Sequence, residues 1–196
     1  MPARARSGSL MTDAVIRSRT EEEIVFDAPG TDQPDSRRLL HWPIGYSPDF
    51  SDLWSLGEVV IDAQPEVVFG HLADICRRER DFTGIGDGSA ADTEPQGLQT
   101  DSEFTYRLDG LAVRARVGEC SRGSRLAWFA QGIDVGLYQE WLFLARGCRT
   151  LVLMGFAARG PAAIAHREAD PAGAQRMVHR CLAGLKAQVE RGTGTA

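Results

Sequence analysis

From Leu56 onward, apolar and polar residues alternate in short runs that predict a strand, a helix and then a series of strands. The run LGEVVIDA is rich in β-branched residues and ends at Gln64-Pro65, where proline suits the first position of a helix over PEVVFGHLADI. Five later runs are separated by hairpin-type turn signals and predict an antiparallel meander: DSEFTYRL, LAVRARVGEC, SRLAWFAQ, GLYQEWLFLA and CRTLVLMGFAA.

After these strands the hydrophobic period changes to that of a helix. Asp170 followed by Pro171 is a good N-cap and first turn, and apolar residues then recur at helical spacing up to Val189. The repeat predicts one amphipathic helix of roughly five turns. The whole order predicts an α+β fold in which a curved antiparallel sheet wraps a long C-terminal helix, with an internal cavity between them.

The first part of the chain has a different composition. Residues 1–37 mix polar residues with Gly and Pro without sustained periodicity, which predicts a flexible arm ahead of one domain over 38–196. The segment LLHWPIGYSPDFSDLW, 39–54, carries large apolar groups between prolines and predicts an ordered, irregular segment that wraps the domain edge.

Composition excludes several classes of function. The formal net charge of -5 argues against a nucleic-acid partner, because such domains present basic surfaces to the phosphate backbone. No run approaches the roughly 20 apolar residues of a membrane span, and the N-terminus has no apolar signal-peptide core. The four cysteines are widely spaced, which favours free thiols in a cytoplasmic protein and gives no support for a metal site.

The most conspicuous polar residues interrupt the apolar run GLYQEWLF. Strand alternation places Gln139 on the face of Trp141 and Phe143, which we expect to point inward, and sends Tyr138 and Glu140 to a solvent-facing outer side. There Glu140 would pair with one of the outer arginines Arg107, Arg114 and Arg116. The reversed register would instead place Glu140 in an apolar cavity, where a raised pKa would make it a general base.

Two other residues are candidates for chemistry. Alternation in EFTYRL turns Tyr106 inward, where it either contacts a ligand oxygen or is a core tyrosine with a local hydrogen bond. His166, just ahead of the terminal helix, either reaches a cavity opening or lies on the surface. The glycine-rich GIGDG at 84–88 lacks the lysine of a phosphate-binding loop and is better interpreted as a lid.

The motifs EVVIDAQPEVVFGHLAD, RVGECSRGSRLAWFA, YQEWLF and GPAAIA...LAGLK, within about residues 39–191, resemble the START-like (SRPBCC, Bet v 1-like) superfamily, and the polyketide cyclase/dehydrase branch in particular. The resemblance implies a helix-grip fold around a cofactor-free cavity for a hydrophobic small molecule. Two departures stand out. The chain has RRERDFTGIGDG where relatives carry a tryptophan-rich segment, and LVLMGF where many have acidic residues.

The resemblance implies a cyclase or dehydratase acting on a polyketide-like intermediate, and a pericyclic cyclisation would suit the few titratable groups. Tyr106, Gln139 and His166 would polarise the substrate or transfer protons. The alternatives are a non-catalytic carrier or sensor of a lipid-like molecule and a protein-interaction module. The oligomeric state stays open, with a homodimer among the alternatives. The expected ligand contacts are Phe104, Tyr106, Trp128, Gln139, Trp141, Phe143, Met154, Met177 and Cys181.

Overall fold

The computed structural model describes residues 36–78, 98–108 and 110–193. Its centre is a six-stranded antiparallel sheet with the strand order β1-β6-β5-β4-β3-β2. The predicted meander is therefore present, and β1 closes the other edge by pairing with β6. The strands are β1 (Leu53–Ile61), β2 (Glu103–Leu108), β3 (Leu111–Ser121), β4 (Arg125–Gly132), β5 (Val135–Arg146) and β6 (Arg149–Arg159).

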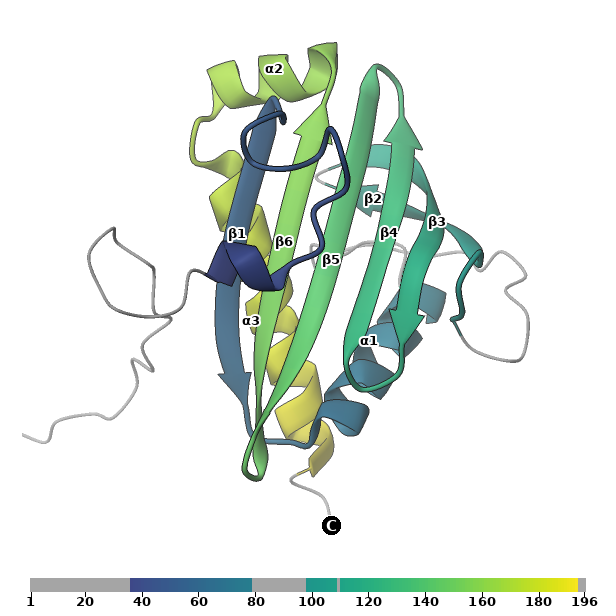
Figure 1. Cartoon of the computed structure of the whole chain (residues 1–196), viewed down its shortest axis with the longest axis vertical. Coiled ribbons are helices and arrows are strands. Elements are labelled where there is room, and N and C mark those ends of the chain that lie inside the picture. The colour runs from purple at the N-terminus through teal and green to yellow at the C-terminus, as the bar shows by residue number, and fades with distance from the viewer. Residues whose placement is uncertain (1–35, 79–97, 109, 194–196) are drawn as a thin grey trace, which may run out of the picture.

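Two helices cover the inner face of the curved sheet. They are α1 (Pro65–Arg78) and the long α3 (Gly173–Thr193), which lie behind the sheet in Figure 1. Helix α3 packs most closely on β1, because Gly57 has no side chain: a Cβ there would lie 2.8 Å from Val178 Cγ1. The α+β helix-grip arrangement expected from the sequence is confirmed.

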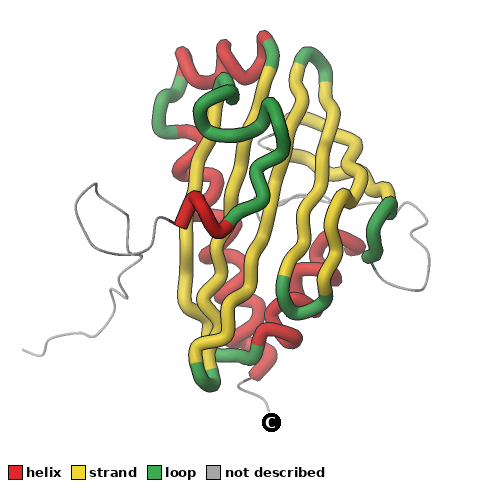
Figure 2. Tube along the Cα trace, viewed as in Figure 1, coloured by secondary structure: helices red, strands yellow, loops and turns green. Residues whose placement is uncertain are grey.

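A short helix that the sequence analysis did not predict, α2 (Pro161–Ala169), lies between β6 and α3 across one end of the sheet (Figures 1 and 2). Gly160, with φ of 113°, makes the sharp turn out of β6, and Pro161 opens the helix. The expected N-cap at Asp170 is wrong, because Asp170 ends α2 and α3 starts only at Gly173.

The outer face of the sheet is crossed by residues 40–50, which we call the strap; it follows the short 3-10 helix η1 (Ser36–Leu39). Leu40 packs on Leu142 and Leu153 of the central strands β5 and β6. A Cβ at Gly155 would lie 2.5 Å from Leu40 Cδ1, so this glycine seats the strap on β6. The prediction that this segment wraps the domain edge is wrong, because its apolar groups cover the middle of the sheet.

Two other predictions, the N-terminal arm and the lid, concern residues that the structure does not describe or describes only in part. Residues 1–35, most of the proposed arm, and the proposed lid at 84–88 lie outside the described residues. Among the described residues, no helix is both long and apolar enough to cross a membrane.

Candidate functional site

Strand β5 carries polar residues into the interior. Gln139 lies directly opposite Trp128 of β4 and Phe156 of β6, and its side chain is 0% exposed. Trp141 and Phe143 follow on the same inner face and belong to the main core. The expected inward direction of these three residues is confirmed, and the reversed register, with Glu140 in the interior, is wrong.

The inner polar layer, as we name Tyr106, Trp128, Gln139 and Trp141, lies within this apolar core. Trp128 Nε1 donates a hydrogen bond to the Tyr106 hydroxyl oxygen at 3.2 Å. The Tyr106 hydroxyl in turn faces Gln139 Oε1 at 3.5 Å, which is long for an O–H···O bond. Side-chain hydrogen bonds thus link β2, β4 and β5 on the inner face of the sheet.

Two donors of the inner polar layer are not used. Gln139 Nε2 and Trp141 Nε1 are buried and have no acceptor within the described part of the chain. A buried N–H group left without an acceptor costs about 1–3 kcal/mol. Two such donors on one strand face therefore indicate a place where a ligand oxygen could accept hydrogen bonds.

The Tyr106 hydroxyl is a proton donor at ordinary pH. Burial raises its pKa well above the usual range for tyrosine, and the hydrogen bond from Trp128 only partly offsets this effect. Tyr106 can therefore donate a hydrogen bond to a ligand oxygen, but it does not supply an anionic base.

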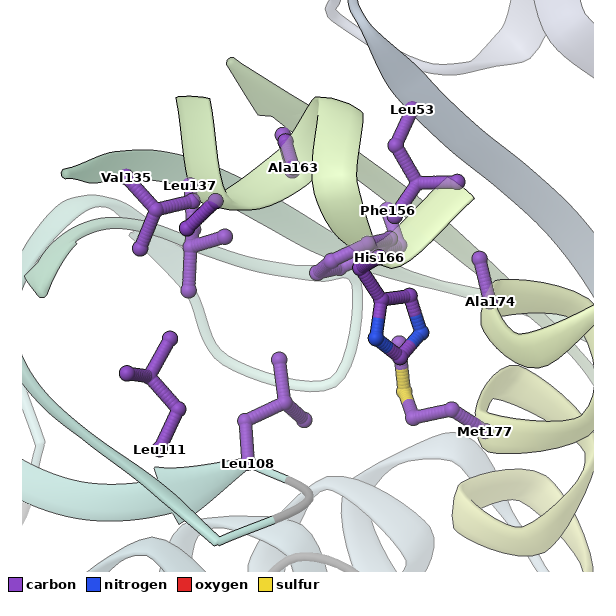
Figure 3. A pocket seen from close by; sticks show the side chains of 12 residues that line it. Leu53, Leu108, Leu111, Val135, Leu137, Phe156, Ala163, His166, Ala174 and Met177 are labelled. Carbon is purple, nitrogen blue, oxygen red and sulfur yellow. The ribbon is translucent and has the colours of Figure 1, made fainter. Parts of the chain in front are cut away.

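A cavity of about 120 Å³ lies next to this layer, beneath α2. Its walls are apolar except for His166, whose imidazole extends from α2 toward Met177 (Figure 3). Leu108 and Leu137 line it, and each is two residues along its strand from Tyr106 or Gln139 on the same inner face. A two-residue step is roughly 7 Å, so the cavity lies about one such step from Tyr106 and Gln139, which do not themselves line it.

His166 lines the cavity and is not part of the inner polar layer. Its ring lies beside the start of α3, where a Cβ at Gly173 would be 2.7 Å from His166 Nε2. Tyr106 and Gln139 are brought together by the hydrogen bond described above, whereas His166 lines the far side of the cavity.

The other expected ligand contacts are all in the core. Phe104 packs edge-to-face on Trp128. Phe143 packs in the same way on Phe69 of α1. Met177 lines the cavity, and its sulfur lies 3.7 Å from the Cys181 thiol sulfur one turn along α3. Met154 is fully buried on β6 opposite Trp141.

Glu140 lies on the outer face, as alternation predicts, but it does not face water. Its carboxylate is 0% exposed beneath the strap and forms an ion pair with Arg125. It also accepts hydrogen bonds from the backbone N–H of His41 and from the Tyr138 hydroxyl, both at 2.8 Å. We name Arg125, Tyr138, Glu140 and the His41 backbone the strap clamp.

The expected cross-strand pairing of Glu140 with an arginine is present, but the partner is Arg125 of β4 and not Arg107, Arg114 or Arg116. Arg114 pairs with Glu103 and Arg116 with Asp101 on the exposed surface of β2 and β3, and Arg107 bonds to the Gly110 carbonyl oxygen. The aromatic residues of the strap were the signal that this part of the outer face would be covered.

The cavity lining was only partly predictable. Alternation in EFTYRL places Leu108 on the same face as Tyr106, which could have identified it. The alanines of α2 that close the cavity, Ala162 and Ala163, carried no such signal because the helix itself was missed.

A more open groove of about 630 Å³ runs along α1 beside the end of β3 and the turn that follows it. Its lining includes Glu66, Asp74 and Arg122, and Phe69 forms part of its floor. Within the described ranges, no group of three or more metal-ligating side chains is present. The apolar cavity with its adjoining buried donors is the stronger candidate for a small-molecule site.

Three solved structures show the fold of the chain. The Helicobacter pylori protein jhp0584 is 22% identical, with a TM-score of 0.67, over 83% of this chain and 99% of that one. A START superfamily protein from Mycobacterium smegmatis is 12% identical, with a TM-score of 0.53, over 70% and 97%. The Zhui aromatase/cyclase from Streptomyces sp. R1128 is 15% identical, with a TM-score of 0.50, over 71% and 94%.

These similarities show that the chain has the START-like helix-grip fold, which confirms the resemblance at the level of fold. No protein-family model matches the sequence, and no curated protein matches it significantly.

Proposed function

We propose that this chain is a cyclase or dehydratase of the polyketide cyclase/dehydrase type, which acts without a cofactor on a hydrophobic polyketide-like intermediate. The observation that carries the proposal is the inner polar layer beside the apolar cavity, with two buried donors that have no acceptor in the described structure. The aromatase/cyclase among the structures of similar fold supports the reaction class by analogy.

The cavity would first act by holding a flexible substrate in a folded shape. A poly-β-ketone has many conformations in water, and only a few bring the reacting carbons together. Apolar walls around Leu108, Leu137 and Phe156 would select a compact shape by burying its hydrocarbon surface. Such positioning can lower the activation free energy by roughly 7–11 kcal/mol in favourable cases.

The inner polar layer would then stabilise the developing charge. In ring closure, an enol carbon forms a bond to a ketone carbon, the π bond of that ketone breaks, and its oxygen gains a proton while the enol oxygen releases one to water. Tyr106, Gln139 and Trp141 would donate hydrogen bonds to the oxygen on which negative charge develops. Loss of the new hydroxyl group as water, with a proton from the adjacent carbon, would complete a dehydration.

The proposed division of roles gives His166 a different task from Tyr106 and Gln139. Its imidazole lies at the cavity wall and is the only titratable side chain among the lining residues described. We propose that it transfers a proton at the end of the substrate far from the inner polar layer.

The test is cyclisation of an N-acetylcysteamine thioester of a short poly-β-keto acid, followed by chromatography and mass spectrometry. We expect Tyr106→Phe and Gln139→Met each to lower turnover roughly 100-fold, since removing one donor to a developing oxyanion costs about that much. Tyr46→Phe and Gln131→Met are matched controls, because they remove the same groups at a half-buried position on the strap and at an exposed position on β4, and they should retain full turnover. Full turnover in both interior variants would contradict the proposed donor roles.

A non-catalytic carrier is the second candidate, and the almost wholly apolar lining of the cavity favours it. The carrier predicts that the same thioester binds in a saturable way and is recovered unchanged. Formation of a cyclised product, of equal mass or one water lighter, would exclude the carrier function.

A further inference from the structure

The size of the cavity restricts what can enter it. Its volume is about 120 Å³, slightly smaller than the roughly 150 Å³ of an engineered apolar cavity that holds benzene. A molecule with two or three fused rings therefore does not fit the cavity without displacing a wall. The walls formed by β1, β5 and β6 belong to the continuous sheet and cannot move separately.

Met177 is the adaptable part of the wall. It projects from α3 into the space below His166, as Figure 3 shows, and it is 2% exposed. On its other side it contacts Cys181, so it fills the interior farther along α3. An unbranched thioether side chain has several low-energy shapes and can be shortened without disturbing the helix backbone. Met177 therefore sets the length of the cavity.

The chemistry beside the cavity restricts the ligand in a second way. Gln139 and Trp141 do not line the cavity. Gln139 lies one two-residue step beyond the lining residue Leu137, opposite Phe156, and Trp141 lies one step farther. Both Gln139 Nε2 and Trp141 Nε1 lack an acceptor in the described part of the chain. Both groups are donors, so the complementary group is an acceptor oxygen such as a ketone. The described cavity lining contains no Lys or Arg that would neutralise a buried carboxylate or phosphate.

Resting on the proposed function, we infer that the buried part of the substrate is a single-ring or similarly sized apolar group with a ketone oxygen, and that Met177 determines this size limit. The ketone oxygen faces Gln139 and Trp141. The thioether of Met177 excludes larger polycyclic ketones from the cavity, and the inner polar layer does not contribute to this exclusion.

The experiment measures binding of acetophenone, 2-acetylnaphthalene and ethylbenzene to the full chain by ¹H–¹⁵N NMR of the tryptophan indole and glutamine amide groups. We expect acetophenone to bind at least tenfold more tightly than 2-acetylnaphthalene. It should also shift the Trp141 indole signal, assigned with Trp141→Phe. Ethylbenzene has the same size without the oxygen and should bind without the hydrogen-bond shift of that signal.

Met177→Ala tests the size limit directly. It should raise the affinity for 2-acetylnaphthalene at least tenfold, whereas Leu153→Ala, which opens a comparable space under the strap, should leave the preference unchanged. Met177→Val is a milder variant that should show the same trend if the alanine variant does not fold. Equal affinity of the native protein for both ketones, failure to bind either ketone, or equal behaviour of the Met177 and Leu153 variants would overturn the inference.

The outcomes separate this inference from the proposed function. A confirmed size limit without any cyclisation of the thioester would leave the binding site in place and reject the enzyme. If the thioester cyclises in a manner that depends on Tyr106 and Gln139, but the protein binds both ketones equally, the enzyme function is supported and the size limit is rejected.

Discussion

The two faces of strand β5 use buried polar groups in opposite ways. On the outer face, the carboxylate of Glu140 is fully buried and is satisfied by Arg125, Tyr138 and the backbone of His41. On the inner face, Gln139 and Trp141 are equally buried, yet each keeps a donor without an acceptor in the described structure. Neighbours along a single strand thus differ in their spare hydrogen-bonding capacity.

The difference indicates on which face of β5 a ligand could bind. The strap clamp uses its polar groups to hold residues 40–50 on the sheet, so a ligand there would have to replace interactions already made. The inner polar layer can gain interactions when an acceptor oxygen arrives. The charged residue is therefore structural, and the neutral amide beside it is the better candidate for recognition.

The largest effect that would test this comparison is expected on the outer face. Glu140→Ala should lower the free energy of unfolding by about 3–5 kcal/mol, because it removes a fully buried carboxylate and leaves the nearly buried Arg125 with only the longer, partly exposed ion pair to Glu119. The measurement is urea denaturation of the variant beside the native protein.

The matched control is Glu103→Ala, which breaks an exposed ion pair with Arg114 and should cost at most about 1 kcal/mol. Similar losses for Glu140→Ala and Glu103→Ala would show that the strap clamp does not stabilise the fold.

A smaller effect is expected at alkaline pH. Burial raises the pKa of both Tyr106 and Tyr138, on opposite faces of the sheet, so each stays protonated in the folded chain after it ionises in the unfolded chain. Their stabilising effect is complete below pH of about 10 and is lost as the pH rises toward the folded values, by roughly 1.4 kcal/mol per tyrosine between pH 9 and pH 11. Urea denaturation at these two pH values measures the loss.

Tyr106→Phe removes the contribution of the inner tyrosine alone. The variant should therefore lose about 1.4 kcal/mol less than the native protein over the same interval. Parallel losses in the two proteins would mean that Tyr106 ionises equally in both states.

The smallest effect is expected at Gln139. Gln139→Met should change the free energy of unfolding by no more than about 1 kcal/mol, because it removes one long hydrogen bond and one buried donor without an acceptor. A loss as large as that of Glu140→Ala in urea denaturation would show that the amide is part of the structural framework, and the contrast between the two faces would be lost.

Much of the fold was predictable because its signals are local. Period-two alternation identified the strands and turned Tyr106 and Gln139 inward, and helical spacing identified α1 and most of α3. Helix α2 was missed because nine residues between a strand and a longer helix carry little periodic signal. The environment of Glu140 was missed because its partners include residues 15 and 99 positions away in the chain.

The sequence by itself determined the order of the strands and of helices α1 and α3, the START-like arrangement and the face on which each residue of β5 lies, because the period of a strand is a property of the local backbone. Only the tertiary structure decided which buried polar groups are satisfied. The strap, distant in sequence, covers Glu140, whereas the described side chains packed around Gln139 and Trp141 provide no acceptor for their free donors. Hydrogen-bond satisfaction depends on contacts between remote segments, and alternation along one strand carries no information about them.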